Sequence, residues 1–281
     1  MARLLRAFFY KLFRDLTFRI TLIIGAGLAV MMSLLYLLIQ KAGQSEVPFD
    51  ICTGQSMLLA AVNPAEGFGY SVPINLCIFI VLEFTSGTIR NKIIAGNSKF
   101  KIYASLFISG LVFAVLLMAM YIALCFGLGC AFGGFDPNGL AFGYGASGFI
   151  YGHFLLKLLV VTLFSYITIT SLAVFIATLA RNVGPCIPVV IVTLMVFGLF
   201  PMILNLMPGS ENVVETLSYI NPLHSLVCYD QTPYLEGGLP TGLYNITIEN
   251  SSLIKSIIVN LVYSVGFFGL GSYLFVKKDV K

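Results

Sequence analysis

Long apolar stretches separated by short polar segments run along most of the chain. They give six candidate spans, judged against the roughly 20 residues that a helix needs to cross a hydrocarbon core of about 30 Å. Helices are the expected form because lipid offers no partners to backbone polar groups, which must therefore bond to one another. The pattern predicts spans over about 18–39, 64–85, 102–130, 149–179, 185–206 and 253–276.

The second span depends on a polar start signal, because its continuous apolar stretch covers only residues 73–84. Asn63, Pro64 and Glu66 occupy the N-cap, first and third positions of a predicted helix, where these residue types are favoured. A helix from there to residue 85, kinked at Pro73, is long enough to cross.

A different periodicity opens the chain. Over residues 3–17, apolar residues recur at helical spacing and cover about half of the helix circumference; they are Leu4, Leu5, Phe8, Phe9, Leu12, Phe13 and Leu16. We expect an amphipathic helix in the membrane interface, with Lys11, Asp15 and Arg19 spaced to pair at i, i+4. The alternative is a plain cytoplasmic extension of the first span.

Charge then orients the spans. With the N-terminus inside, only Lys41, Lys157 and Lys255 fall outside, whereas thirteen basic residues fall inside: Arg3, Arg6, Lys11, Arg14, Arg19, Arg90, Lys92, Lys99, Lys101, Arg181, Lys277, Lys278 and Lys281. This asymmetry predicts that both termini and residues 83–101 are cytoplasmic.

Composition agrees with a membrane protein. Hydrophobic residues make up 58% of the 281 and charged residues 10%, against about 45–50% and about 25% in ordinary globular domains. We therefore expect one all-α transmembrane domain over residues 1–281, multi-pass and N-in/C-in. Within the outer segment 207–252, the pattern predicts two short helices before the last span, over 210–219 and from Asn221 towards Cys228.

Motifs for catalysis are missing from the sequence. It has no G-x-x-x-x-G-K-[ST] phosphate loop, H-E-x-x-H zinc helix or G-x-S-x-G nucleophile elbow. His153 and His224 are predicted at the outer surface without clustered partners, and no C-x-x-C spacing occurs. We expect no enzyme, no metal site, no cofactor and no nucleic-acid partner. Cys52 and Cys228 fall on the same predicted side, which leaves a disulfide open.

Two ionisable residues fall within predicted spans. Glu83 lies about one turn from the cytoplasmic end of the second span, where burial demands a partner that Arg90 or Lys92 can supply. Lys157 lies near the outer end of the fourth span, within reach of the headgroups. A structural ion pair for Glu83 and snorkelling for Lys157 are favoured over direct contact with a substrate.

Residues 83–101, EFTSGTIRNKIIAGNSKFK, interrupt the apolar pattern with a basic segment. Thr85 or Ser86 can cap a short helix over 88–95, Gly96 can end it in the left-handed conformation, and Ser98 can begin the third span. Such a helix is too short to be stable alone and must be held by its neighbours. The alternative is a capped turn whose basic residues meet anionic headgroups.

The same segment carries a family resemblance. The run from Glu83 through Gly87 to Lys92, followed by Gly96 to Lys99 and then by Ile102 and Tyr103, resembles the E-x-x-x-G-T-[IL]-R-N-K…G-x-[ST]-[RK]…[IV]-Y pattern of ABC-2 membrane subunits of ABC transporters. Bacterial permeases for bacitracin resistance, lantibiotic immunity and multidrug export belong to that group. The local match covers about 20 residues, and the predicted architecture is similar throughout the chain.

The resemblance implies that residues 87–96 form a coupling helix, which docks on a separate ATPase subunit. The implied coupling residues are Glu83, Gly87, Thr88, Ile89, Arg90, Asn91, Lys92, Ile93, Ile94 and Gly96, with the three isoleucines as apolar contacts. ATP and Mg would bind in the partner, and two ATPases and a second permease would complete the transporter. The implied activity is export of a hydrophobic or amphipathic molecule, such as a peptide antibiotic, drug or lipid. The rival hypothesis is a channel or a scaffold for a peptidase or sensor kinase, without ATP-driven transport.

Overall fold

The computed structural model describes residues 2–42, 52–62, 68–135, 140–141, 144–145, 154–205, 229–236, 239–248 and 250–277. Helices dominate these ranges: α1 (Ala2–Arg14), α2 (Leu16–Ala42), α3 (Gly54–Val62), α4 (Phe68–Thr85), α5 (Thr88–Ile94), α6 (Lys99–Gly133), α7 (Phe154–Ala180), α8 (Val183–Asn205) and α10 (Asn250–Lys277). Short strands complete them: β1 (Leu140–Ala141), β2 (Tyr144–Gly145), β3 (Tyr229–Glu236) and β4 (Leu239–Ile248).

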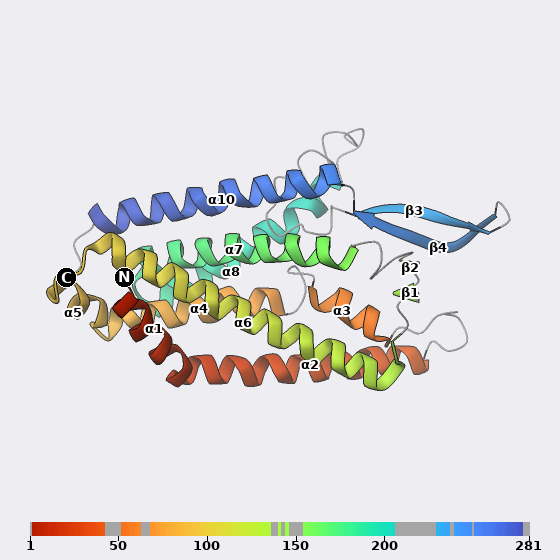
Figure 1. Cartoon of the computed structure of the whole chain (residues 1–281), viewed down its shortest axis with the longest axis horizontal. Helices are drawn as coiled ribbons and strands as arrows, with labels where there is room; N and C mark the ends of the chain where they lie inside the picture. Colours follow the sequence, from red (N-terminus) through yellow and green to blue (C-terminus); the bar gives the residue numbers. More distant parts are fainter. Residues whose placement is uncertain are drawn as a thin grey trace.

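The long helices lie along one common axis (Figure 1). At one end of this bundle lie α1, α5 and the C-terminal end of α10, and we call it the α5 end. Strands β3 and β4 lie at the opposite end. Helix α1, the end of α10 and the basic segment 83–101 are therefore together, and strands β3 and β4 are far from them.

Within the described residues, four helices are long and apolar enough to cross a membrane, namely α2, α6, α7 and α10. α4 passes the same test only together with α5, from which it is bent by 55°. α8 contributes a shorter apolar stretch, Val183–Phe197. The structure is thus that of a multi-pass helical membrane protein, and each of the six ranges predicted as spans overlaps one of these helices.

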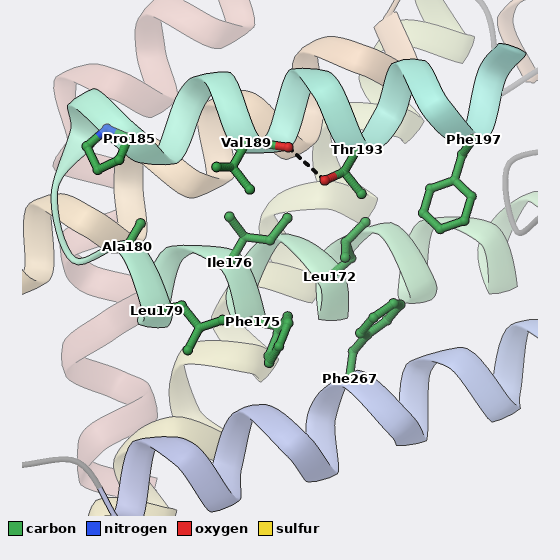
Figure 2. Close-up of a pocket in the computed structure, with 10 residues that line it drawn as sticks. All are labelled: Leu172, Phe175, Ile176, Leu179, Ala180, Pro185, Val189, Thr193, Phe197 and Phe267. Atoms are coloured by element: carbon green, nitrogen blue, oxygen red, sulfur yellow. Dashed lines mark hydrogen bonds between the residues drawn. The ribbon is translucent and has the colours of Figure 1, made fainter.

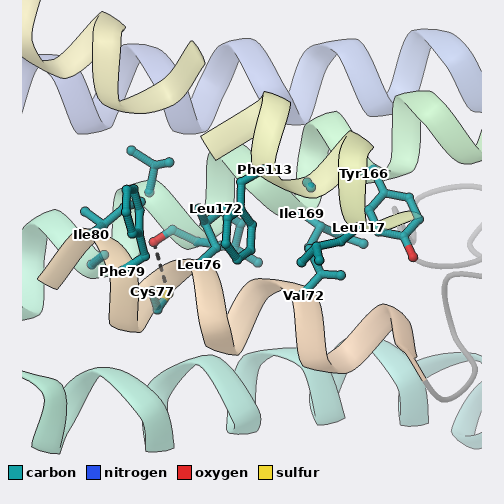
Figure 3. Packing of buried hydrophobic residues seen from close by; sticks show 14 of the residues in the cluster. Val72, Leu76, Cys77, Phe79, Ile80, Phe113, Leu117, Tyr166, Ile169 and Leu172 are labelled. Carbon is teal, nitrogen blue, oxygen red and sulfur yellow. Dashed lines mark hydrogen bonds between the residues drawn. The ribbon is translucent and has the colours of Figure 1, made fainter. Parts of the chain in front are cut away.

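Helix α4 lies at the centre of the packing. Val72, Leu76 and Ile80 are fully buried on it, and Figure 3 shows them against side chains of α6 and α7, with α8 on the other side. The Cys77 thiol donates a hydrogen bond to the Ala173 carbonyl of α7 at 3.2 Å. Because other helices enclose α4 on several sides, its C-terminal end, where α5 begins, is held in place.

The N-terminal helix differs from its prediction in two respects. It ends at Arg14. The next residue, Asp15, caps α2, because its side chain accepts a hydrogen bond from the Thr17 backbone N–H at 2.8 Å. The predicted pairing of Lys11 with Asp15 is therefore wrong. The apolar stripe of α1 is also buried against the protein itself, since Leu4, Phe8 and Leu12 are all less than 9% exposed.

Helix α3 lies between the first and second predicted spans, in residues that the sequence analysis leaves without a predicted helix. The Ser56 N–H donates to the Thr53 hydroxyl at 3.3 Å, which caps this helix, and nearly all of its residues are buried. It packs closely on α6: a side chain at Gly133 would collide with the Cys52 carbonyl, and one at Gly129 with Met57. The apolar run from Met57 to Val62 was the available signal.

Part of the outer segment, beyond the two short helices predicted there, forms strands that the sequence analysis does not predict. β3 and β4 pair antiparallel, and the order in the sheet is β1-β2-β4-β3. The sequence does hold a hairpin signal here, because Gly237 and Gly238 separate two runs rich in Tyr, Thr and Ile. The predicted helices over 210–219 and 221–228 lie outside the described residues, as does the start of the second span at 63–67.

Candidate functional site

Helix α5 connects the end of α4 to the start of α6. Gly87, at the N-cap, has a φ of 68°, and Gly96, just beyond the helix, has a φ of 83°, both in the left-handed region that favours glycine. The expected cap by Thr85 or Ser86 is wrong, since no side chain caps α5 and the Ser86 hydroxyl donates instead to the Leu82 carbonyl at 2.6 Å. Ser98 caps α6 as predicted.

A single buried carboxylate joins three helices at this corner. Glu83, on α4, is fully buried. Its Oε2 lies 2.9 Å from Lys92 Nζ of α5, and its Oε1 lies 2.6 Å from Lys11 Nζ of α1. The Thr88 hydroxyl, at the start of α5, lies 2.8 Å from Oε2 and from the Glu83 carbonyl oxygen. Lys92 was one of the two partners expected from the sequence, and Lys11 was not.

Lys92 has an aromatic partner as well. Its Nζ lies 3.2 Å from the centroid of the Phe8 ring on α1, which gives a cation–π contact. Burial lowers the pKa of the Lys92 ammonium, and the attraction of Glu83 opposes that effect. Two cations around one carboxylate leave this junction with net positive charge. We call Lys11, Glu83, Thr88 and Lys92, with Phe8, the Glu83 junction.

The two sides of α5 differ sharply in exposure. Ile89 is 1% exposed and Ile93 packs partly buried against the core. Ile94 is 73% exposed, and Arg90 and Asn91 are exposed beside it. Of the three isoleucines expected to contact a partner, only Ile94 lies open, and Lys92 is turned inward to Glu83. The outer face of α5 therefore consists of Arg90, Asn91 and Ile94.

Further bonds fix the C-terminal end of α5. The Asn97 side-chain amide donates to the Lys92 carbonyl at 3.0 Å, and the Gly96 N–H donates to the Ile93 carbonyl at 2.9 Å. Lys99 Nζ, in the first turn of α6, donates to the Val276 carbonyl of α10 at 3.1 Å. The end of α5 is thus fixed by local hydrogen bonds, and the start of α6 that follows it is bonded to α10.

A second feature is an apolar groove of about 610 Å³ between α7 and α8, closed on one side by Phe267 of α10. Figure 2 shows Ala180 and Pro185 at one end of it and Phe197 and Phe267 at the other. The polar side chain in its lining, Thr193, donates its hydroxyl to the Val189 carbonyl at 2.7 Å. The groove suits an aliphatic or aromatic surface rather than a charged ligand.

The remaining candidates contribute little chemistry. Within the described ranges, no three His, Cys, Asp or Glu side chains are grouped to hold a metal ion. Cys52 is buried with its thiol 3.8 Å from the Ser33 carbonyl oxygen, whereas Cys228, His153 and His224 lie outside the described residues. A disulfide between Cys52 and Cys228 stays a prediction.

Lys11 was not predicted as a partner of Glu83, although the sequence holds a signal for it. On a helical wheel it falls within the stripe of Leu4, Phe8 and Leu12, which all become buried. A lone cation on the apolar side of an amphipathic helix needs a buried anion. Glu83 was the acidic residue already known to need a partner.

Comparison of the chain with protein-family models gives no match, and neither does comparison with curated protein sequences.

Proposed function

We propose that this chain is the membrane subunit of an ABC transporter of the ABC-2 type, with α5 as its coupling helix. Two observations support the proposal: the motif from Glu83 to Tyr103, and the Glu83 junction, which fixes α5 to α4 and α1 while Arg90, Asn91 and Ile94 remain exposed. The junction is the stronger of the two, because it gives a physical role to the motif's Glu, Thr and second basic residue.

Force on α5 would reach the helices α4 and α1 through the contacts of the Glu83 junction. A partner that displaces the outer face of α5 moves Thr88 and Lys92, and with them the carboxylate of Glu83. Glu83 belongs to α4, whose core packing leaves little room for independent motion. Lys11 carries the same displacement to α1. The ATPase, with ATP and Mg, is a separate subunit in this account, and the chain itself catalyses no reaction.

The orientation that goes with this function has six spans, with both termini and α5 in the cytoplasm. Basic residues gather at the α5 end, among them Arg14, Arg90 and Lys101. Lys157 and Lys255, near the starts of α7 and α10, belong to the opposite end. This asymmetry supports the orientation through the positive-inside rule, and an ATPase bound to α5 would then lie in the compartment that holds ATP.

A hydrophobic or amphipathic cargo fits the chain best. The groove between α7 and α8 has an apolar lining, and its threonine is already bonded within α8. We propose export of a peptide antibiotic, a drug or a lipid-like molecule across a bacterial cytoplasmic membrane, by two permease subunits and two ATPases.

Purification of the tagged chain from its native cells in mild detergent, with mass spectrometry of the proteins that accompany it, tests this function. The proposal expects an ATPase with a phosphate loop in stoichiometric amount, together with a second permease or a second copy of this one. A homo-oligomer alone, or a peptidase or sensor kinase in place of the ATPase, would overturn it in favour of the channel or scaffold.

A further inference from the structure

The outward side of α1 combines basic and aromatic side chains. Arg6 and Arg14 are exposed there, and Tyr10 and Phe13 are 61% and 55% exposed. These four residues recur at helical spacing on the side opposite the buried stripe, and we call them the outer face of α1. Since the helix has already buried one apolar stripe in the protein, this second surface needs an environment of its own.

Carboxylates do not neutralise this face in the part of the chain that the structure describes. The two ion pairs among the described residues both involve Glu83, one with Lys11 and one with Lys92. Arg14 lies over the Tyr10 ring instead, with its Cζ 4.5 Å from the ring centroid. Stacking of this kind holds a guanidinium beside an apolar surface without removing its charge.

The place of α1 in the bundle fits the level of lipid headgroups. It lies at the α5 end, directly before the apolar helix α2, whose Leu16 is 69% exposed. Arg6 and Arg14 are eight residues apart, which is about 12 Å along a helix. That separation is too large for one phosphate group and suits two neighbouring headgroups.

We propose that the outer face of α1 binds anionic phospholipids, with Arg6 and Arg14 each contacting a phosphate and with Tyr10 and Phe13 in the interfacial layer. Lys11, on the inner side of the same helix, bonds to Glu83 at 2.6 Å. Lipid on the outer face therefore holds α1 in the position that completes the Glu83 junction and keeps α5 in place. The lipid site stands whether or not α5 binds an ATPase.

Melting of the purified full chain in mild detergent tests the site, with added phosphatidylglycerol, phosphatidylcholine or soluble glycerol phosphate. Phosphatidylglycerol raises the melting temperature, and the other two do not. The variant Arg6→Gln/Arg14→Gln requires about 30-fold more phosphatidylglycerol for the same shift. The charge-matched control Lys101→Gln/Lys277→Gln, at exposed positions outside the outer faces of α1 and α5, responds as the wild type does.

Three results would overturn the proposal: equal shifts with both lipids, an equal shift with glycerol phosphate, or an unchanged response of the double arginine variant. Equal loss in the control variant would likewise replace a site on α1 by a general effect of charge. If the double variant does not fold, the single variants Arg6→Gln and Arg14→Gln decide, each with about a 5-fold weaker response.

Discussion

Glu83 shows how one side chain can settle the position of a whole helix. A fully buried carboxylate is costly unless it is paired, and here Lys11, Lys92 and Thr88 all contact it. The Glu83 carboxylate offsets the cost of burying both lysines, so the burial of Lys11, Glu83 and Lys92 is interdependent. We expect their contributions to be coupled rather than additive.

Replacing Glu83 by Gln tests that coupling. The change leaves two cations without their anion, and we expect a loss of about 2 kcal/mol or more, which lowers the melting temperature in detergent by about 5 °C. This is below the full cost of breaking a buried pair because the Lys11 side chain is 38% exposed. In a double-mutant cycle with Lys92→Gln, the second change costs much less once Glu83 is gone. Strictly additive effects would show that the junction does not act as a unit.

The junction was only partly predictable from the sequence. A need for a partner at Glu83 follows from its place in an apolar run, and Lys92 lies close in sequence. Lys11 is 72 positions away along the chain and reaches Glu83 only because α1 packs against the bundle. Contacts of that kind depend on tertiary packing, which local periodicity does not encode.

Some of the helix contacts in this chain require a glycine. Tyr103 of α6 is fully buried, and its ring lies 5.4 Å from Phe268 and 5.8 Å from Phe275 of α10, measured between centroids. Its hydroxyl lies directly over Gly271, where a Cβ atom would collide with it. The absence of a side chain at this position is therefore required for the contact between α6 and α10.

Gly271→Ala should destabilise the protein by about 1–3 kcal/mol through overpacking. Gly266→Ala, on the same helix, is the matched control, because a Cβ there meets nothing within 4 Å and alanine favours the helix by up to about 1 kcal/mol. Thermal melting of both variants in one detergent compares them. A loss of stability at Gly266 as large as at Gly271 would contradict the packing argument.

The sequence predicted the helices that consist of long apolar runs. It did not predict the short helix α3 or which residues of α5 are buried. The ranges of α2, α6, α7, α8 and α10 each coincide with a predicted span to within a few residues. α3 was missed because nine residues are too few to give a span signal, and its burial depends on the glycines of α6. In α5, the resemblance implied that all three isoleucines contact a partner, but the sequence could not show that Ile89 faces inward.

The arrangement of the chain as a whole separates a basic end from an end with strands. If the α5 end is cytoplasmic, single cysteines placed in a cysteine-free background must differ in accessibility. A membrane-impermeant maleimide should label Asp230→Cys in β3 from outside intact cells, and Arg90→Cys in α5 only after permeabilisation. Labelling of both from the same side would contradict the proposed topology.

The proposed docking of an ATPase on the outer face of α5 can be tested at Ile94. Ile93, which also belongs to the motif, packs partly in the core, so a charge there would disturb folding as well as docking. Ile94 is 73% exposed, so Ile94→Asp leaves the fold intact and places a charge in the contact, while Ile94→Leu keeps an apolar side chain.

The most direct measurement is the amount of ATPase that copurifies with the tagged chain in wild type, Ile94→Asp and Ile94→Leu, normalised to the chain itself. The account predicts at least about a tenfold loss for Ile94→Asp, the consequence of losing a buried apolar contact, and wild-type recovery for Ile94→Leu. Undiminished ATPase with Ile94→Asp in a folded protein would contradict it.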